Sequence, residues 1–194
     1  PDSSKYNDYM LLSPETPEDS VIMTRSFTSM IYLAVVMSYY VGGKKEKIEQ
    51  LKDYAANAES FLKATDEMAK KIVAEHPECN LFITLGQGIN YGIANECMNK
   101  MKEMSLGNEN TVDGDAKLLT QMKGYGAKVL AIGNNASKDF TDVDYTLDMP
   151  YGYDSLQNAP IIGFIGQLIG YYVAELKNLN ADSPRHLTQA IVIK

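Results

Sequence analysis

The chain has 194 residues, of which 45% are hydrophobic, and a formal net charge of −7 with a pI of about 4.9. This length and apolar content suffice for one sizeable core, and the acidic balance argues against nucleic acid or an anionic membrane as partner. Cys79 and Cys97 lack C-x-x-C spacing, so we expect reduced thiols in a cytoplasmic protein. His76 and His186 have no clustered ligands, so we expect no metal site. Ile31–Val41 is apolar but too short to span a bilayer, and we expect no membrane association.

The first forty residues predict an arm followed by a helix. Residues 1–19 are polar and carry three prolines, which is typical of an irregular arm or linker. A brief extended piece at Val21–Met23 leads into a strongly apolar helix at Thr24–Tyr40. Either Thr24 or Ser26 would supply the N-cap of this helix.

One long helical stretch is expected at Lys44–Glu75. Its apolar residues recur near the helical period, and Pro77 ends it before the next strand. Helices of this kind more often bridge domains or subunits than carry chemistry, so we interpret residues 44–77 as a connecting helix.

The segment Leu81–Glu103 is the most informative part of the chain. A short apolar strand at Leu81–Leu85 is followed by the glycine pair Gly86 and Gly88 and then by a helix. A strand, a glycine turn and a helix N-terminus together commonly hold an anion, because backbone N–H groups point outward there and the helix dipole favours negative charge. The alternative is that the glycines only make a tight turn.

The helix after this turn adds two carboxylates. Glu96 and Glu103 are two turns apart and share a face, with Asn99 between them. Glu103 lies in the last turn, where the negative end of the helix dipole opposes a carboxylate, and this suits a general base that takes a proton from carbon. The alternative is a solvated surface glutamate that pairs with Lys100 or Lys102.

The remainder of the chain alternates between strands and helices. We predict a helix around Ala116–Lys123, strands at Lys128–Ile132 and Asp144–Met149, and an apolar helix at Ala159–Lys177. The alternation implies a parallel sheet covered by helices on both faces. Three glycines form a smooth stripe on the last helix, which we interpret as close packing against a neighbour: Gly163, Gly166 and Gly170.

Three segments, in order, resemble the sugar isomerase (SIS) family. GQGINYGIANECMNKMKEMSL at Gly86–Leu106 is similar to the start of an SIS domain, with its G-x-G-x-N-Y turn and a helix ending in K-x-K-E. Met23–Met30, MTRSFTSM, is similar to the stretch that closes the first SIS domain of tandem members. Asn180–Leu187, NADSPRHL, resembles the C-terminal N-x-D-x-P-R-x-L segment of the same proteins.

The resemblance implies an α/β fold: a three-layer αβα sandwich with a parallel sheet, a flavodoxin-like SIS domain, plus the tail of a preceding SIS domain. Residues 1–43 would be the C-terminal remnant of that first domain, and residues 78–194 the second SIS domain. The resemblance also implies a homodimer whose sites draw groups from two chains.

The sequence departs from the family pattern in three places. Around Asn108–Gly114 a strand and an H-G-P loop are missing, and we expect that the sequence omits a stretch near 108–112, because a sheet short of one strand would leave buried edges unpaired. The S-x-S-G-x-T phosphate loop of the first SIS domain is absent. Gln189 stands where synthase members have a lysine, and an amide cannot form a Schiff base, which makes synthase chemistry doubtful.

By this resemblance the protein is a phosphosugar isomerase or deaminase that moves a proton between C1 and C2, most like a glucosamine-6-phosphate deaminase. The alternatives are a ketose-phosphate isomerase, a fructosamine-6-phosphate deglycase, and a non-catalytic sugar-phosphate sensor. No cofactor is expected, since proton transfer alone makes the enediol or enolamine.

Glu103 is the predicted catalytic base. One interpretation of His186 is a group that opens the sugar ring, although the ring-opening histidine of the family belongs to the H-G-P loop that is missing here. Arg185 would bind phosphate or pair with a carboxylate at a domain junction. The predicted substrate-binding residues are Gly86, Gly88, Asn90, Glu96, Thr24, Arg25, Ser26, Arg185 and His186.

Overall fold

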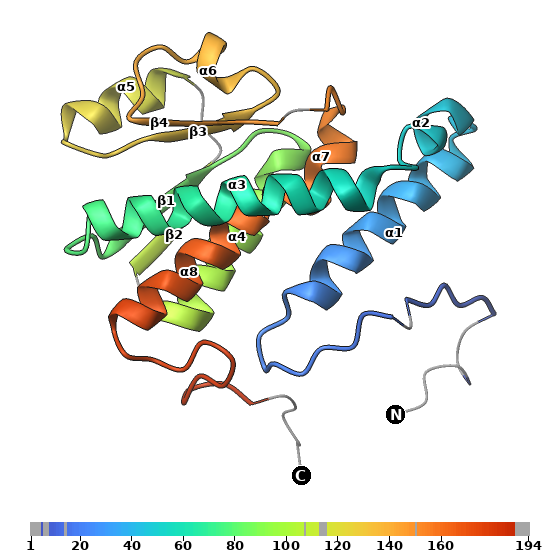
Figure 1. Cartoon of the computed structure of the whole chain (residues 1–194), viewed down its shortest axis with the longest axis horizontal. Helices are drawn as coiled ribbons and strands as arrows, with labels where there is room; N and C mark the ends of the chain where they lie inside the picture. The colour runs from blue at the N-terminus through green and yellow to red at the C-terminus, as the bar shows by residue number, and fades with distance from the viewer. Residues whose placement is uncertain are drawn as a thin grey trace.

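The computed structural model of the protein (Figure 1) describes residues 5, 8–13, 15–106, 108–112, 116–149 and 151–188. The helices in this part of the chain are α1 (Arg25–Val41), α2 (Lys45–Glu49), α3 (Tyr54–Glu75), α4 (Ile89–Ser105), α5 (Ala116–Gly124), α6 (Ala136–Asp139), α7 (Ser155–Ile162) and α8 (Phe164–Leu176). The strands are β1 (Leu81–Leu85), β2 (Asn108–Val112), β3 (Leu130–Gly133) and β4 (Tyr145–Asp148).

All strand pairing in the described residues is parallel, as the alternating pattern predicted. β1 pairs with β2, with Leu81 opposite Asn108, and β3 pairs with β4, with Leu130 opposite Tyr145. These two pairs are separate two-stranded sheets, and helices pack around them in an α/β sandwich. The predicted αβα fold class is therefore confirmed in its parallel strands and helical layers.

The segment after α4 is a strand and not the predicted loop, whereas the omission of a stretch near 108–112 stays a prediction. Asn108–Val112, which the sequence analysis treated as a loop that runs into the next helix, forms β2 beside β1. Its partner β1 is itself exposed or half-buried along its length.

The centre of the molecule is the packing of α8 on α4 and α3 (Figure 1). A Cβ added to Gly166 would lie 2.5 Å from Cys97 Cα, and one added to Gly170 would lie 3.2 Å from the Lys100 carbonyl oxygen. Gly163 meets nothing within 4 Å. Close helix packing is thus confirmed for two of the three glycines.

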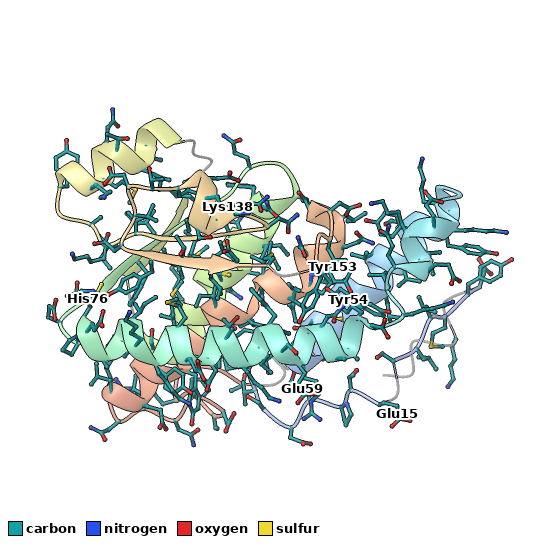
Figure 2. The ribbon with its side chains drawn as sticks, turned by 45° about the horizontal axis from the view of Figure 1, so that its top comes forward. Glu15, Tyr54, Glu59, His76, Lys138 and Tyr153 are labelled. Carbon is teal, nitrogen blue, oxygen red and sulfur yellow. The ribbon has the colours of Figure 1, made fainter. Side chains whose placement is uncertain are left out.

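A second core joins α1 and α3 to β4 and α7. Its aromatic centre is Tyr54 and Tyr153, whose rings lie 5.4 Å apart near one end of α3, while His76 lies at the other end (Figure 2). Buried Tyr54 Oη donates to the Gln157 carbonyl oxygen at 2.7 Å, and Asn57 Nδ2 donates to Tyr153 Oη at 2.7 Å.

Two helix boundaries differ from the predictions. The stretch Lys44–Glu75 is broken into α2 and α3, because Lys47 of α2 is held by α7: its ammonium lies 2.9 Å from Asp154, and its carbonyl oxygen accepts from Gln157 Nε2. The last helix begins at Ser155 rather than Ala159 and is divided at Gly163. Asp154 and Gln157 form a capping box, so the pattern D-x-x-Q was the overlooked start signal.

Within the described residues, one stretch, Ser155–Leu176, is long and apolar enough to cross a membrane. Of its 18-residue apolar window 56% is buried inside the protein, and the stretch packs against α3 and α4. The stretch therefore contributes to the core of the protein through the part that packs on α3 and α4.

The segment before α1 and the segment after α8 meet beside α4. The Val21 N–H donates to the Asp182 carbonyl oxygen at 2.9 Å, and Ser20 Oγ donates to the same oxygen at 3.0 Å. Ile22, only 1% exposed, packs in a small cluster with Met104 and Ala181. The expected extended piece at Val21–Met23 is therefore a docked segment that contacts the C-terminal end of α4.

Candidate functional site

A groove of about 600 Å³ lies between α1, α4 and α7. Its apolar lining includes Phe27, Ile31 and Val35 from α1, Ile93 and Met98 from α4, and Leu156 from α7. Polar side chains lie mainly on the α4 wall: Asn95, Glu96 and Asn99, with Ser38 on α1. The groove is large enough for a small organic molecule, and its polar groups converge on one side.

An ion cluster on α4 adjoins this groove. The Lys100 ammonium lies 2.7 Å from Glu103 Oε2 and 3.2 Å from Glu96 Oε1. The exposed fraction of the side chain is 4% for Lys100, 15% for Glu96 and 25% for Glu103. Lys100 is thus nearly removed from water and is neutralised by carboxylates one turn away on either side.

Glu96 is the more buried carboxylate of the cluster. Burial raises its pKa, the nearby Lys100 ammonium opposes that rise, and the Glu103 carboxylate adds to it. Glu96 Oε1 has no hydrogen bond of good geometry, although Lys100 lies within ion-pair distance. Its contact with the described part of the chain is therefore the ion pair with Lys100 alone.

Glu103 reaches the groove through Asn99. Asn99 Nδ2 donates to Glu103 Oε1 at 3.0 Å, and Asn99 lines the groove whereas Glu103 does not. Both oxygens of Glu103 are therefore held, one by an amide and one by an ammonium. Such a carboxylate is fixed in orientation and is separated from the groove lining by Asn99.

The glycine turn before α4 is sterically required. A Cβ on Gly86 would lie 2.3 Å from the Asn90 carbonyl oxygen, and Gly88 has φ of 57°, which favours glycine. The tight-turn interpretation is thus confirmed, and anion binding by the turn stays a prediction. Among the residues that the structure describes, no side chain caps α4, and the buried Asn90 Oδ1 has no hydrogen-bond partner.

The N-terminus of α1 is occupied by a carboxylate from the arm. Glu18 Oε2 accepts from the Thr24 N–H at 2.8 Å, the Ser26 N–H at 3.0 Å and Ser26 Oγ at 3.0 Å. Partial burial acts to raise the Glu18 pKa, but these hydrogen bonds and nearby Arg25 hold it below its ordinary value. The expected cap from a Thr24 or Ser26 side chain is wrong, because Glu18 supplies the acceptor instead.

The structure does not bring the remaining predicted residues to the groove. Arg185 and His186 are exposed, on a segment that Leu187 anchors to the cluster of Ile22 and Met104. Arg25 lies 3.8 Å from Asp19 on the surface. None of Thr24, Arg25, Ser26, Arg185 and His186 lines the groove. Gln189 lies outside the described residues.

Sequence reasoning missed the burial of Lys100 and the part played by Asn99. The signal was the spacing E-x-x-x-K-x-x-E at Glu96–Glu103, which puts a lysine between two carboxylates on one helix face. The α1 wall could not be found from sequence, because it comes from tertiary packing. Among the described residues no group of three or more His, Cys, Asp or Glu side chains converges to hold a metal ion.

Comparison with known proteins finds similarity along almost the whole chain. No protein-family model matches. The glutamine–fructose-6-phosphate aminotransferase of Buchnera aphidicola is 24% identical, covering 97% of this chain and 36% of its own length. The same enzyme of Sulfurisphaera tokodaii is also 24% identical, and the match covers 98% of this chain and 36% of that protein.

Two solved structures share the fold. The glucosamine-6-phosphate deaminase of Thermotoga maritima has a TM-score of 0.73 at 19% identity, covering 98% of this chain and 63% of its own. The C-terminal domain of glucosamine-fructose-6-phosphate aminotransferase from Francisella tularensis has a TM-score of 0.68 at 17% identity, covering 95% and 63%. The fold is therefore that of these sugar-phosphate proteins.

These findings confirm the resemblance to the SIS family that three short segments indicated. The chain spans a little over one third of the length of the curated relatives it matches, 36% for the two named above. The match to the Buchnera protein extends over 226 residues, more than the 194 of this chain, so that relative has residues inside the matched region that this chain lacks.

Proposed function

We propose that this chain carries the proton-transfer site of a phosphosugar isomerase or deaminase. The substrate would be an open-chain amino-sugar or keto-sugar phosphate, and the favoured reaction is like that of a glucosamine-6-phosphate deaminase. The observation that carries the proposal is the buried Lys100, held between Glu96 and Glu103 beside a ligand-sized groove. Similarity to an isomerizing aminotransferase and to a deaminase supports the same class.

Glu103 would move the proton between C1 and C2. Its two oxygens are fixed by Asn99 and Lys100, so the carboxylate is oriented before substrate arrives, and this lowers the cost of reaching the reacting geometry. Lys100 would balance the charge of the carboxylate as the proton leaves and returns. Glu96 would hold Lys100 in place from the opposite side.

The phosphate would bind at the glycine turn before α4. Gly86 and Gly88 keep side chains away from the helix N-terminus, and no side chain caps it. The turn adjoins Ile89, which lines one end of the groove, so a sugar phosphate could extend from the turn toward Asn99. The homodimer, the cytoplasmic location and the division at residues 43 and 77 stay predictions.

A non-catalytic sugar-phosphate sensor is the second candidate. It is favoured by the position of Glu103, which lies behind Asn99 rather than in the groove lining. A ketose-phosphate isomerase and a fructosamine-6-phosphate deglycase would use the same cluster for the same proton transfer, and a substrate panel separates them.

The test is proton exchange at C2. Wild type, E103Q, E96Q and the control E59Q are incubated in D₂O with glucosamine-6-phosphate, fructose-6-phosphate and a fructosamine-6-phosphate, and exchange is followed by NMR. Glu59 is an exposed glutamate that pairs with Lys63 at the same 2.7 Å. We expect E103Q to lose exchange by about 10²-fold or more while phosphate binding persists, and E59Q to match wild type.

Unchanged exchange in E103Q would assign the base elsewhere. If wild type binds the sugar phosphates but exchanges none of them, the sensor is correct and the enzyme proposal fails.

A further inference from the structure

The lining of the groove does not suit an anionic ligand. Within the described part of the chain, none of its lining residues is a lysine or an arginine, and most are apolar. A phosphate placed there would lose its hydration without gaining a cation or a row of amide donors. The groove must therefore take something other than the phosphate end of a sugar.

The charge of the adjoining cluster points to a cation. Two carboxylates, Glu96 and Glu103, face one ammonium, Lys100, so the cluster keeps one uncompensated negative charge with little access to water. Glu96 lines the groove, and its buried Oε1 lies 3.2 Å from the Lys100 ammonium and has no other donor among the described residues. Asn99, which also lines the groove, carries an amide carbonyl. These groups are the complement of an ammonium ion.

We propose that the groove binds a primary amine with an apolar substituent. The ammonium would lie against Glu96 and Asn99, and the apolar body would lie between α1 and α7, against Ile31, Val35 and Leu156. The substrate class becomes an N-substituted amino-sugar phosphate whose amine carries a branched aliphatic or aromatic group. This inference rests on the proposed function and names the amine that the reaction would release.

The reaction on such a substrate balances with water as its co-reactant. In a 1-amino-1-deoxyketose phosphate, the base removes a proton from C1, the enaminol accepts a proton at C2, and C1 becomes an imine. Water adds to this imine, the C1–N bond breaks, and the nitrogen leaves as the primary amine that carries both hydrogens of the added water. The oxygen of that water remains as the C1 aldehyde. The groove would hold the leaving amine.

Binding of the amine alone tests the inference without any turnover. The probes are 3-methylbutylamine, its neutral analogue 3-methylbutan-1-ol, and the polar ethanolamine, titrated into the whole chain by calorimetry and NMR. We expect 3-methylbutylamine to bind about tenfold or more tightly than either comparison probe, because only it satisfies both the carboxylate and the apolar wall.

Two variants locate the binding. Gly92 lines the groove and has nothing within 4 Å of an added Cβ, so G92L would fill the groove without disturbing the helix, and we expect it to abolish amine binding. The matched control is G124L, since Gly124 is exposed, equally unobstructed and not in the lining. E96Q should remove the preference for the amine over the alcohol.

Equal binding of amine and alcohol to wild type, or amine binding that survives G92L, would overturn the inference. Because no sugar phosphate is present, this outcome is distinct from failure of the proposed function. Amine binding without proton exchange on any sugar phosphate would leave the groove as an amine site and refute the enzyme proposal alone.

Discussion

Replacing Lys100 with methionine would leave two carboxylates facing each other without a cation. Methionine matches the length of the lysine stem, so the change removes the charge and keeps most of the packing. Lys100 Nζ lies 2.7 Å from Glu103 and 3.2 Å from Glu96, and only 4% of its side chain is exposed. Breaking a buried pair costs about 3–5 kcal/mol.

The expected loss of stability is somewhat below that range. Glu96 and Glu103 keep 15% and 25% of their side-chain exposure, so water compensates for part of the lost ammonium. We expect K100M to lower the free energy of unfolding by about 2–3 kcal/mol, a large fraction of the stability of a domain. Urea unfolding at pH 7, followed by circular dichroism, measures this difference.

The matched control is K63M. Lys63 also lies 2.7 Å from a glutamate, Glu59, but both side chains are more than 60% exposed. K63M should lower the free energy of unfolding by about 0.5 kcal/mol or less. Distance is equal in the two pairs and burial differs, so equal losses in K100M and K63M would refute the reasoning that burial makes the cluster strong.

The same comparison has a pH dependence with a definite sign. The Glu96 pKa is already raised by burial, and removing Lys100 takes away the charge that opposes the rise. A carboxyl group whose pKa is higher in the folded than in the unfolded protein lowers the free energy of unfolding at high pH. This destabilisation decreases as the pH falls and the group becomes protonated. The deficit of K100M should therefore shrink between pH 7 and pH 5, and a deficit that grows would contradict this account.

Three further predictions concern the packing around the site. G166A should destabilise by about 2 kcal/mol in urea unfolding because its new Cβ would meet the backbone of α4, whereas G163A, with open space, should change stability by about 0.5 kcal/mol or less. G86A should cost about 2 kcal/mol or more by the same measurement, because the turn must open to admit a Cβ. E18Q should lower the free energy of unfolding by about 1 kcal/mol by removing the α1 cap. Because the Glu18 pKa is lowered in the folded protein, the stabilisation by Glu18 is present at neutral pH and is lost as acid protonates the carboxylate. A pH series of wild-type unfolding should show this loss.

Helices and strands with a regular apolar pattern could be predicted from the sequence, whereas features that depend on tertiary contacts could not. Strands β1, β3 and β4 and helices α1, α4 and α5 follow from apolar spacing and glycine turns within a few residues. β2 escaped because its polar side chains show no strand pattern, and its pairing depends on an exposed partner strand. The break between α2 and α3 escaped because it depends on Asp154 and Gln157, which are distant in sequence.

The candidate site shows the same division. Local spacing was enough to put Glu96 and Glu103 on one face of a helix, and the structure bears this out. Lys100 lies between them, and whether it is exposed to water or buried depends on how closely α8 approaches α4. The glycine stripe predicted close packing of the last helix but not how close it would be. The groove needs three helices that only the folded chain brings together.

The hydrogen bond between Ser20 and Asp182, here called the clasp, has a consequence for the kinetics of folding. It joins positions 162 residues apart along the chain, so closing it costs much entropy, whereas the pairing of β1 with β2 closes a short loop. We expect the clasp to be the last contact to form on refolding and the first to open in native-state amide exchange. Because the clasp rests on Met104, the residue next to Glu103, each opening would briefly free the end of α4 to move.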